Sequence, residues 1–205
     1  MKQLILKMTH VGEWNMNSYA LICPETEQSV LIDPGDDPDK LMTMLKGSRP
    51  VAIWLTHTHH DHVGALDEMR QRLKLPVYAH SGEHVVDPQA NHWLEHGDVL
   101  NVGNHRCEVY HTPGHIGDQI CFALQNDPRI IVGDTIFEGG PGKTRSHVDF
   151  VQTLNTLRDV VLSWPNEYVC YPGHGPHFVL GDKRANIEIF LTKSHPRNFF
   201  GDAVW

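Results

Sequence analysis

Five side chains that can bind a metal ion lie within six positions of the sequence, at His57, His59, His60, Asp61 and His62. They follow the apolar run Val51–Leu55, which is typical of a buried strand. Side chains two positions apart point the same way in an extended chain, so His57 and His59 can face one pocket, with Asp61 and His62 reaching it after a turn. Imidazole and carboxylate ligands without a nearby cysteine suit zinc, iron or manganese rather than a structural thiolate zinc site. A solvated polar loop is the alternative interpretation.

Three more ligand-type residues each follow a β-type run and a turn shaped by glycine or proline: His115, Asp134 and His174. Alone, a histidine in a glycine turn is more often structural than functional. Their shared position after strands makes them candidates together, because loops at strand ends carry the reactive groups of many enzymes.

Short β-type runs and amphipathic helical segments must position these residues. Strands are predicted at Leu4–Met8, Ser18–Cys23, Ser29–Asp33, Val51–Leu55, Pro76–Ala79, Arg106–His111, Gln119–Leu124, Arg129–Val132 and Tyr168–Tyr171. Helices are predicted at Asp39–Lys46, Val63–Leu73, Asp149–Leu162 and Lys183–Lys193. Ser146 and Asp149 match a capping box before the third helix.

The two halves of the chain resemble each other. A strand ends at Asp33, a helix follows, and the next strand leads into His57. Later a strand ends at Asp134, a helix follows, and the next strand leads into His174. Strands mixed with helices in both halves indicate an α/β sandwich, with two sheets covered by helices on their outer faces. We expect one domain over residues 1–205.

Composition excludes several classes of protein. The 205 residues contain 25 acidic and 17 basic side chains, and the net charge of −8 argues against a nucleic-acid partner. Lys7 and His10 interrupt the apolar N-terminal run, and no run approaches the roughly 20 residues of a membrane helix. The four cysteines form no C-x-x-C pair. We therefore expect a cytoplasmic protein without a membrane partner, as a monomer or weak oligomer.

The pattern His57-x-His59-x-Asp61-His62, followed by His115, Asp134 and His174, resembles the dinuclear metal signature of the metallo-β-lactamase-fold hydrolases. The resemblance extends from Tyr19–Ile22 and Leu31–Gly35 to Pro172–Pro176. It implies an αββα four-layer sandwich and two divalent metal ions, zinc in the first place, with iron or manganese as alternatives. It implies that one metal is held by His57, His59 and His115 and the second by Asp61, His62 and His174, with Asp134 bridging them.

A two-metal centre implies a mechanism without a serine or cysteine nucleophile. Divalent ions about 3.5–4 Å apart lower the pKa of a shared water toward about 7. The resulting bridging hydroxide is expected to attack a carbonyl carbon while a metal takes the developing negative charge. Asp61 is the expected catalytic residue, because it would bind the second metal and orient the nucleophile through its free oxygen.

Within the superfamily, Gly133–Phe137 followed by Gly139–Lys143 is similar to the glyoxalase II branch, the hydroxyacylglutathione hydrolases. In that branch the lysine of a G-x-G-K stretch contacts the glycine carboxylate of glutathione, a role that falls on Lys143. The implied reaction is hydrolysis of the thioester S-lactoylglutathione to D-lactate and glutathione. A thiolate of pKa about 8.5 leaves with little help from a general acid. A lysine that contacts only solvent is the alternative for Lys143.

Two features depart from glyoxalase II. Only 31 residues follow His174, where the family continues into a C-terminal helical domain, so we expect a short form lacking that domain. The segment Ile116–Gln119 also differs from the usual threonine- or serine-containing continuation. The glutathione site is therefore expected to be partial and the specificity broad.

Other reaction classes remain as alternatives. A glutathione persulfide dioxygenase shares the fold but uses one iron held by two histidines and a carboxylate, and Gly142–Arg145 resembles its loop. A lactonase or another small-molecule hydrolase of the same fold is the next alternative. A β-lactamase would need export, and nucleic-acid processing conflicts with the negative charge. The complete set of seven ligand-type residues disfavours a non-enzymatic metal-binding module.

Overall fold

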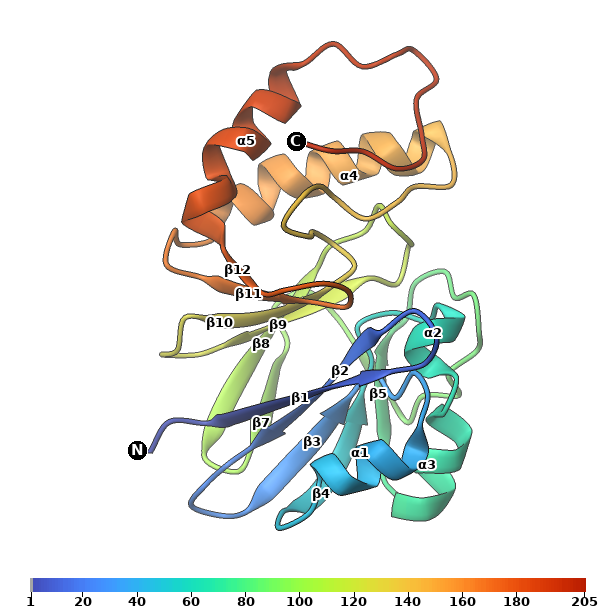
Figure 1. Cartoon of the computed structure of the whole chain (residues 1–205), viewed down its shortest axis with the longest axis vertical. Coiled ribbons are helices and arrows are strands. Elements are labelled where there is room, and N and C mark those ends of the chain that lie inside the picture. Colours follow the sequence, from blue (N-terminus) through green and yellow to red (C-terminus); the bar gives the residue numbers. More distant parts are fainter. Residues whose placement is uncertain (1) are drawn as a thin grey trace.

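The computed structural model describes residues 2–205, which form two six-stranded sheets packed face to face (Figure 1). The first sheet has its strands in chain order: β1 (Ile5–Val11), β2 (Met16–Ile22), β3 (Gln28–Ile32), β4 (Arg49–Trp54), β5 (Val77–His80) and β6 (His92–Leu94). The second sheet has the spatial order β12 (Phe178–Val179), β11 (Val169–Pro172), β10 (Arg129–Gly133), β9 (Ile120–Leu124), β8 (His105–His111) and β7 (Val99–Val102).

Helices cover the outer face of each sheet. The first sheet carries α1 (Pro38–Met44), α2 (His60–Val63) and α3 (Leu66–Leu73). The second carries α4 (His147–Asp159), the 3-10 turn η1 (Val161–Ser163) and α5 (Leu180–Thr192). Figure 1 shows α4 and α5 on one side of the paired sheets and α1 to α3 on the other, which confirms the αββα sandwich expected from the sequence. Within residues 2–205, no helix is long and apolar enough to cross a membrane.

The central core lies between the two sheets. Tyr19 and Trp54 of the first sheet meet Phe122 and Ile131 of the second, and all four side chains are buried. The rings of Trp54 and Phe122 are 5.1 Å apart, a spacing at which aromatic pairs add about 0.5–1.5 kcal/mol beyond their buried area. Two further apolar clusters fill the spaces beneath the helices. The sheets that carry the site are therefore buried on both faces.

The predicted strands and helices are confirmed, with shifts of a few residues at their ends. Strands β6, β7 and β12 were missed because they are two to four residues long and lie at or near sheet edges, where the apolar pattern is weak. The predicted helix Val63–Leu73 differs most: the helix begins earlier, at His60, and is interrupted at Gly64–Ala65. Ser146 caps α4 as predicted, since its side chain accepts a hydrogen bond from the Asp149 amide at 3.2 Å.

The two halves do repeat the same unit. Strands β3 and β4 are parallel and joined through α1, and β10 and β11 are parallel and joined through α4. Ile32 pairs with Trp54 and Gly133 with Pro172, so each pair of strands ends at the same level. The residues that follow these ends therefore meet at one edge of the sandwich.

Candidate metal centre

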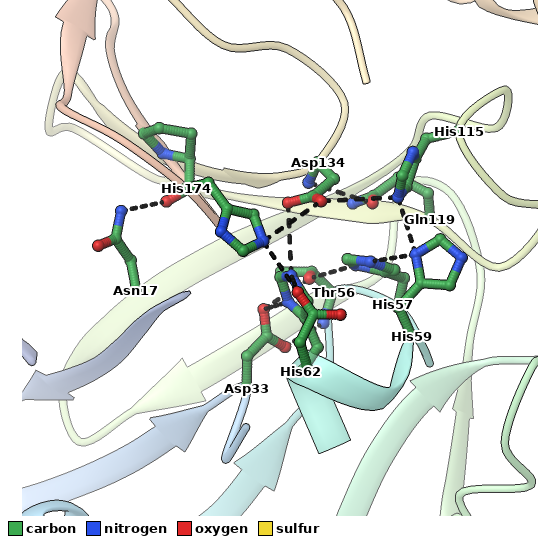
Figure 2. A network of polar contacts seen from close by, with 12 residues as sticks. Asn17, Asp33, Thr56, His57, His59, His62, His115, Gln119, Asp134 and His174 are labelled. Atoms are coloured by element: carbon green, nitrogen blue, oxygen red, sulfur yellow. Dashed lines mark hydrogen bonds and ion pairs between the residues drawn. The ribbon is translucent and has the colours of Figure 1, made fainter. Parts of the chain in front are cut away.

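The segment after β4 changes from extended chain to helix within the predicted motif. His59 is extended, with φ −66° and ψ 148°, and serves as the N-cap of α2. His57 and His59 thus leave an extended segment, whereas Asp61 and His62 come from the first turn of the helix. This change of direction turns His57, His59 and His62 toward the edge where β10 and β11 end (Figure 2). Asp61 reaches the same place, since its Oδ2 lies 2.9 Å from Nε2 of His174, which follows β11.

Three imidazole nitrogens converge on one side of this site. His57 Nε2 lies 3.1 Å from His59 Nδ1, which in turn lies 2.8 Å from His115 Nε2. All three atoms lie within 4.8 Å of one another. Nitrogen atoms gathered in this way offer three ligands to one cation.

A second group lies beside the first. His174 Nε2 is 2.9 Å from Asp61 Oδ2, and His62 Nε2 is 3.9 Å from the same oxygen. These three ligand atoms also lie within 4.8 Å of one another. The structure therefore places these six side chains in two neighbouring triads with the membership expected from the sequence, and a third close set, His57, His62 and Asp134, joins them.

Asp134 lies between the two groups (Figure 2). Its Oδ1 is 3.4 Å from His62 Nε2, and its Oδ2 is 3.5 Å from His115 Nε2 and 3.8 Å from His174 Nε2. Each oxygen thus faces a histidine of the second group, and Oδ2 also faces one of the first. This placement suits a carboxylate that bridges two cations, and all seven predicted side chains meet at one site.

A buried carboxylate that received no role from the sequence orients both groups. Asp33 Oδ2 accepts a hydrogen bond from His62 Nδ1 at 3.0 Å and from the Thr56 hydroxyl at 2.6 Å. Because that hydroxyl donates to Asp33, its oxygen accepts from Nδ1 of His57, 3.1 Å away. In its neutral form each ring therefore turns an unprotonated Nε2 toward the site, as metal ligation requires.

Other contacts fix the remaining ligands. His115 Nδ1 donates to the Lys143 carbonyl at 2.7 Å, which leaves its Nε2 free to bind a metal. Asn17 Nδ2 donates to the carbonyls of Pro172 and Gly175, both at 2.9 Å, and so holds the loop that carries His174. The Asp134 amide donates to Gln119 Oε1 at 3.3 Å. Side chains from both sheets therefore support the site.

Arg145 is a further residue that sequence reasoning did not assign. Its Nη2 lies 2.8 Å from His59 Nε2 and donates to it. A metal bound at Nδ1 of His59 would leave the hydrogen of the neutral ring on Nε2. Metal binding at Nδ1 and this hydrogen bond therefore exclude each other, and loading the site would release the guanidinium.

The first group is prepared to bind as neutral imidazoles. Burial, together with the neighbouring histidines, holds the pKa of His57 well below its usual value. Burial and the nearby His115 and Arg145 lower the pKa of His59 to about 3. Burial also lowers the pKa of His115, although Asp134 opposes the shift. Near neutral pH these three rings need lose no proton before binding a cation.

In the second group the pKa values of the two histidines are raised instead of lowered. Burial disfavours the charged form of His62, but Asp134 and Asp33 outweigh it and raise its pKa well above the usual value. Burial likewise opposes charge on His174, while Asp61 and Asp134 raise its pKa. Burial would raise the pKa of Asp134, but the charges of the surrounding histidines lower it to about 2. Without a metal, the carboxylates therefore favour the protonated form of both imidazoles.

Two orphaned atoms show that the site fits a cation. His62 Nε2 and Asp134 Oδ1 are buried, and within the described chain neither has a hydrogen-bond partner, which is costly. Gly173 leaves space beside them, since a Cβ there would lie 2.2 Å from Asp134 Oδ1 and 3.0 Å from His62 Nε2. A cation between nitrogen and oxygen would satisfy both atoms, so the donor set fits the group implied by the sequence.

A cavity of about 510 Å³ opens beside the site and contains Lys143. His115, Asp134 and His174 line it together with Phe137 and Pro141. Lys143 lies in the same cavity with its side chain 63% exposed, and its Nζ is 3.0 Å from Asp202 Oδ2. The Lys143 ammonium, which is predicted to bind a substrate carboxylate, therefore lies at the cavity. It is already paired with the carboxylate of Asp202.

A family model described as the metallo-beta-lactamase superfamily matches residues 12–174. The chain belongs to this superfamily. A Bacillus subtilis (strain 168) protein named "Probable metallo-hydrolase YqgX" is 33% identical over 187 residues, covering 81% of this chain and 88% of that protein. The hydroxyacylglutathione hydrolase of Nitrosococcus oceani is 32% identical over 174 residues, covering 83% of this chain and 66% of that enzyme. The match thus spans about two thirds of that hydrolase.

Solved structures agree with the metallo-β-lactamase fold. BLEG-1 B3 metallo-beta-lactamase has a TM-score of 0.81 and 29% identity, covering 92% of this chain and 100% of its own. ETHE1 from Myxococcus xanthus has a TM-score of 0.79 and 27% identity, covering 93% of this chain and 86% of its own. TTHA1623 in a di-iron-bound form has a TM-score of 0.73 and 30% identity, covering 87% and 96%. The chain is therefore a metallo-hydrolase of this superfamily, and its substrate must be inferred from the site.

Proposed function

We propose that the chain is a hydroxyacylglutathione hydrolase, which converts S-lactoylglutathione to D-lactate and glutathione. The observation that carries the proposal is the meeting of seven imidazole and carboxylate side chains at one site, three of which line a cavity that also contains Lys143. Relatives of 30–34% identity that bear the name hydroxyacylglutathione hydrolase support it.

The residues named above would hold two divalent ions, one at His57, His59 and His115 and the other at Asp61, His62 and His174, with Asp134 between them. When bound, two such ions lower the pKa of a water toward about 7 and withdraw charge from a carbonyl oxygen. Zinc is the first expectation, and the di-iron form of TTHA1623 supports iron as the main alternative.

The chain's own residues would position the reactants. Asp61 presents Oδ2 to His174 at 2.9 Å, which leaves Oδ1 to accept a hydrogen bond from the attacking water and orient it toward the thioester carbon. Lys143, which lines the same cavity, would bind a carboxylate of the thiol part. The departing thiolate needs no general acid at neutral pH, because its own pKa is about 8.5.

Glutathione persulfide dioxygenation is the second candidate, and the likeness to ETHE1 keeps it as the alternative. That reaction uses one iron held by two histidines and a carboxylate. The structure instead gathers a second complete group, Asp61, His62 and His174, beside the first. The second group supports hydrolysis, because the chain then offers ligands for two metal ions rather than for one.

Two assays on one metal-loaded preparation separate these functions. We expect thiol release from S-D-lactoylglutathione and no oxygen uptake with glutathione persulfide. Asp61→Asn should lower kcat by about 100-fold or more, since the water loses its orienting carboxylate. His60→Ala is the matched control, because His60 lies inside the motif but is exposed and outside both groups. Oxygen uptake with a single bound iron, without thioester hydrolysis, would refute the proposal.

A further inference from the structure

Residues 201–205, here called the tail segment, lie along the loop 138–144 that borders the cavity. The Thr144 amide donates to the Gly201 carbonyl at 3.1 Å, and the Trp205 amide donates to the Gly139 carbonyl at 3.1 Å. The Trp205 indole donates to the Glu138 carbonyl at 2.9 Å. Three hydrogen bonds to backbone carbonyls, spread over five residues, fix the tail segment at the cavity.

Close packing shows that the loop is shaped to receive the tail segment. A Cβ at Gly140 would lie 2.1 Å from the Ala203 carbonyl oxygen, so any side chain there would displace the tail segment. At the other end, the Trp205 ring packs edge-on against Phe190 of α5, with centroids 5.8 Å apart. The position of the tail segment is therefore set from both sides.

The tail segment completes the wall of the substrate cavity. Asp202, Ala203 and Val204 line the same cavity as His115, Asp134 and His174. Asp202 reaches Lys143, with 3.0 Å between Oδ2 and Nζ. The Asp202 carboxylate thus forms an ion pair with the same Lys143 ammonium that would bind a carboxylate of the substrate.

An anionic substrate group has to compete with this internal carboxylate. A carboxylate arriving at Lys143 must displace Asp202 or share the ammonium with it, and like charges at that distance repel. A thiol that has no charge at this position meets the neutral Lys143–Asp202 ion pair and experiences no such repulsion. Both side chains are exposed, 63% for Lys143 and 79% for Asp202, so solvent moderates the effect to about two- to fivefold in affinity.

We propose that Asp202 is a specificity-determining residue that competes with the substrate carboxylate for Lys143. The consequence is a pocket that accepts thioesters of uncharged thiols as readily as those of glutathione. The proposal rests on the proposed thioester hydrolysis for its biological meaning, but the competition itself is a binding property of the cavity.

The test is a double-mutant cycle on the metal-loaded protein, using Asp202→Asn, Lys143→Met and the two combined. Calorimetry measures the Kd of glutathione and of its glycine ethyl ester, which lacks the carboxylate. Asp202→Asn should tighten glutathione binding about two- to fivefold and leave ester binding unchanged. In the Lys143→Met background the gain should vanish. For S-D-lactoylglutathione, Asp202→Asn should lower KM by the same factor at unchanged kcat.

Asp159→Asn is the matched control, because it removes one exposed carboxylate from the far end of α4 and corrects for net charge. The proposal would be overturned if Asp202→Asn left the Kd of glutathione unchanged or changed the Kd of the ester equally. It would also be overturned if the gain in glutathione affinity persisted in the Lys143→Met background, or if neither the wild type nor Asp202→Asn bound glutathione measurably. A Lys143-dependent gain in binding without thioester hydrolysis would support Asp202 as competitor and refute the proposed function.

Discussion

Asp33 accepts a hydrogen bond from His62 at 3.0 Å, and through this contact a residue outside the ligand set controls the ligand geometry. The same carboxylate binds Thr56, whose hydroxyl holds His57. One buried carboxylate therefore orients a ring in each of the two groups. Partners of this kind commonly change metal affinity by about 10–100-fold when they are removed.

Asp33→Asn should therefore weaken metal binding at both groups. The carboxylate accepts three hydrogen bonds, from the Thr56 amide at Oδ1 and from the Thr56 hydroxyl and His62 at Oδ2. An asparagine has one acceptor oxygen, so its NH2 group must face one of these donors. We expect metal affinity to fall by about 10-fold or more, measured by competition with a chromophoric chelator. Asp36→Asn is the control, because Asp36 is exposed and close in sequence. Equal affinities for the two variants would contradict the orienting role of Asp33.

Metal retention should depend on pH differently in the two groups. The pKa values of His62 and His174 are raised, so protons compete with a metal there as the pH falls. The pKa values of His57, His59 and His115 are lowered, so protons compete weakly. Dialysis from pH 8 to pH 5 should release the metal of the second group first. Metal content that falls from two to none in one step would contradict this order.

Asp118 should make the metal-free protein less stable as the pH rises. Both of its carboxylate oxygens are buried without a hydrogen-bond partner in the described chain, and burial raises its pKa to about 6. The unfolded value is near 3.9, so its favourable contribution is present below about pH 4 and is lost as the pH rises through 6. Asp118→Asn should be more stable than the wild type at pH 8, by about 2 kcal/mol, and similar at pH 4. Urea unfolding measures this difference. A variant less stable at pH 8 would contradict it.

Lys143→Met should act on binding rather than on the chemical step. The ammonium lies in the cavity and belongs to neither group of ligand-type residues, so its loss removes attraction for the substrate carboxylate. We expect KM for S-D-lactoylglutathione to rise about two- to fivefold with kcat unchanged. Lys193→Met, at the end of α5, is the control. An unchanged KM would remove Lys143 from the substrate site.

The seven converging residues could be predicted because each follows a strand end and four of them share one local motif. Asp33 carried a similar signal, since it ends a strand as Asp134 does, but its role depends on contact with Thr56 and His62, more than twenty residues away. Asn17 supports a loop 155 residues away, and Asp202 lies next to Lys143 only because the tail segment folds back. No local pattern predicts such contacts, because they follow from packing.

Asp134 tests the central claim most directly, because its two oxygens face histidines of both groups. The measurement is metal content per chain together with thioester hydrolysis, in the wild type and in Asp134→Ala. We predict two metal ions in the wild type, and in the variant a loss of metal together with a loss of hydrolysis. Hydrolysis that persists in Asp134→Ala would contradict the proposed two-metal centre.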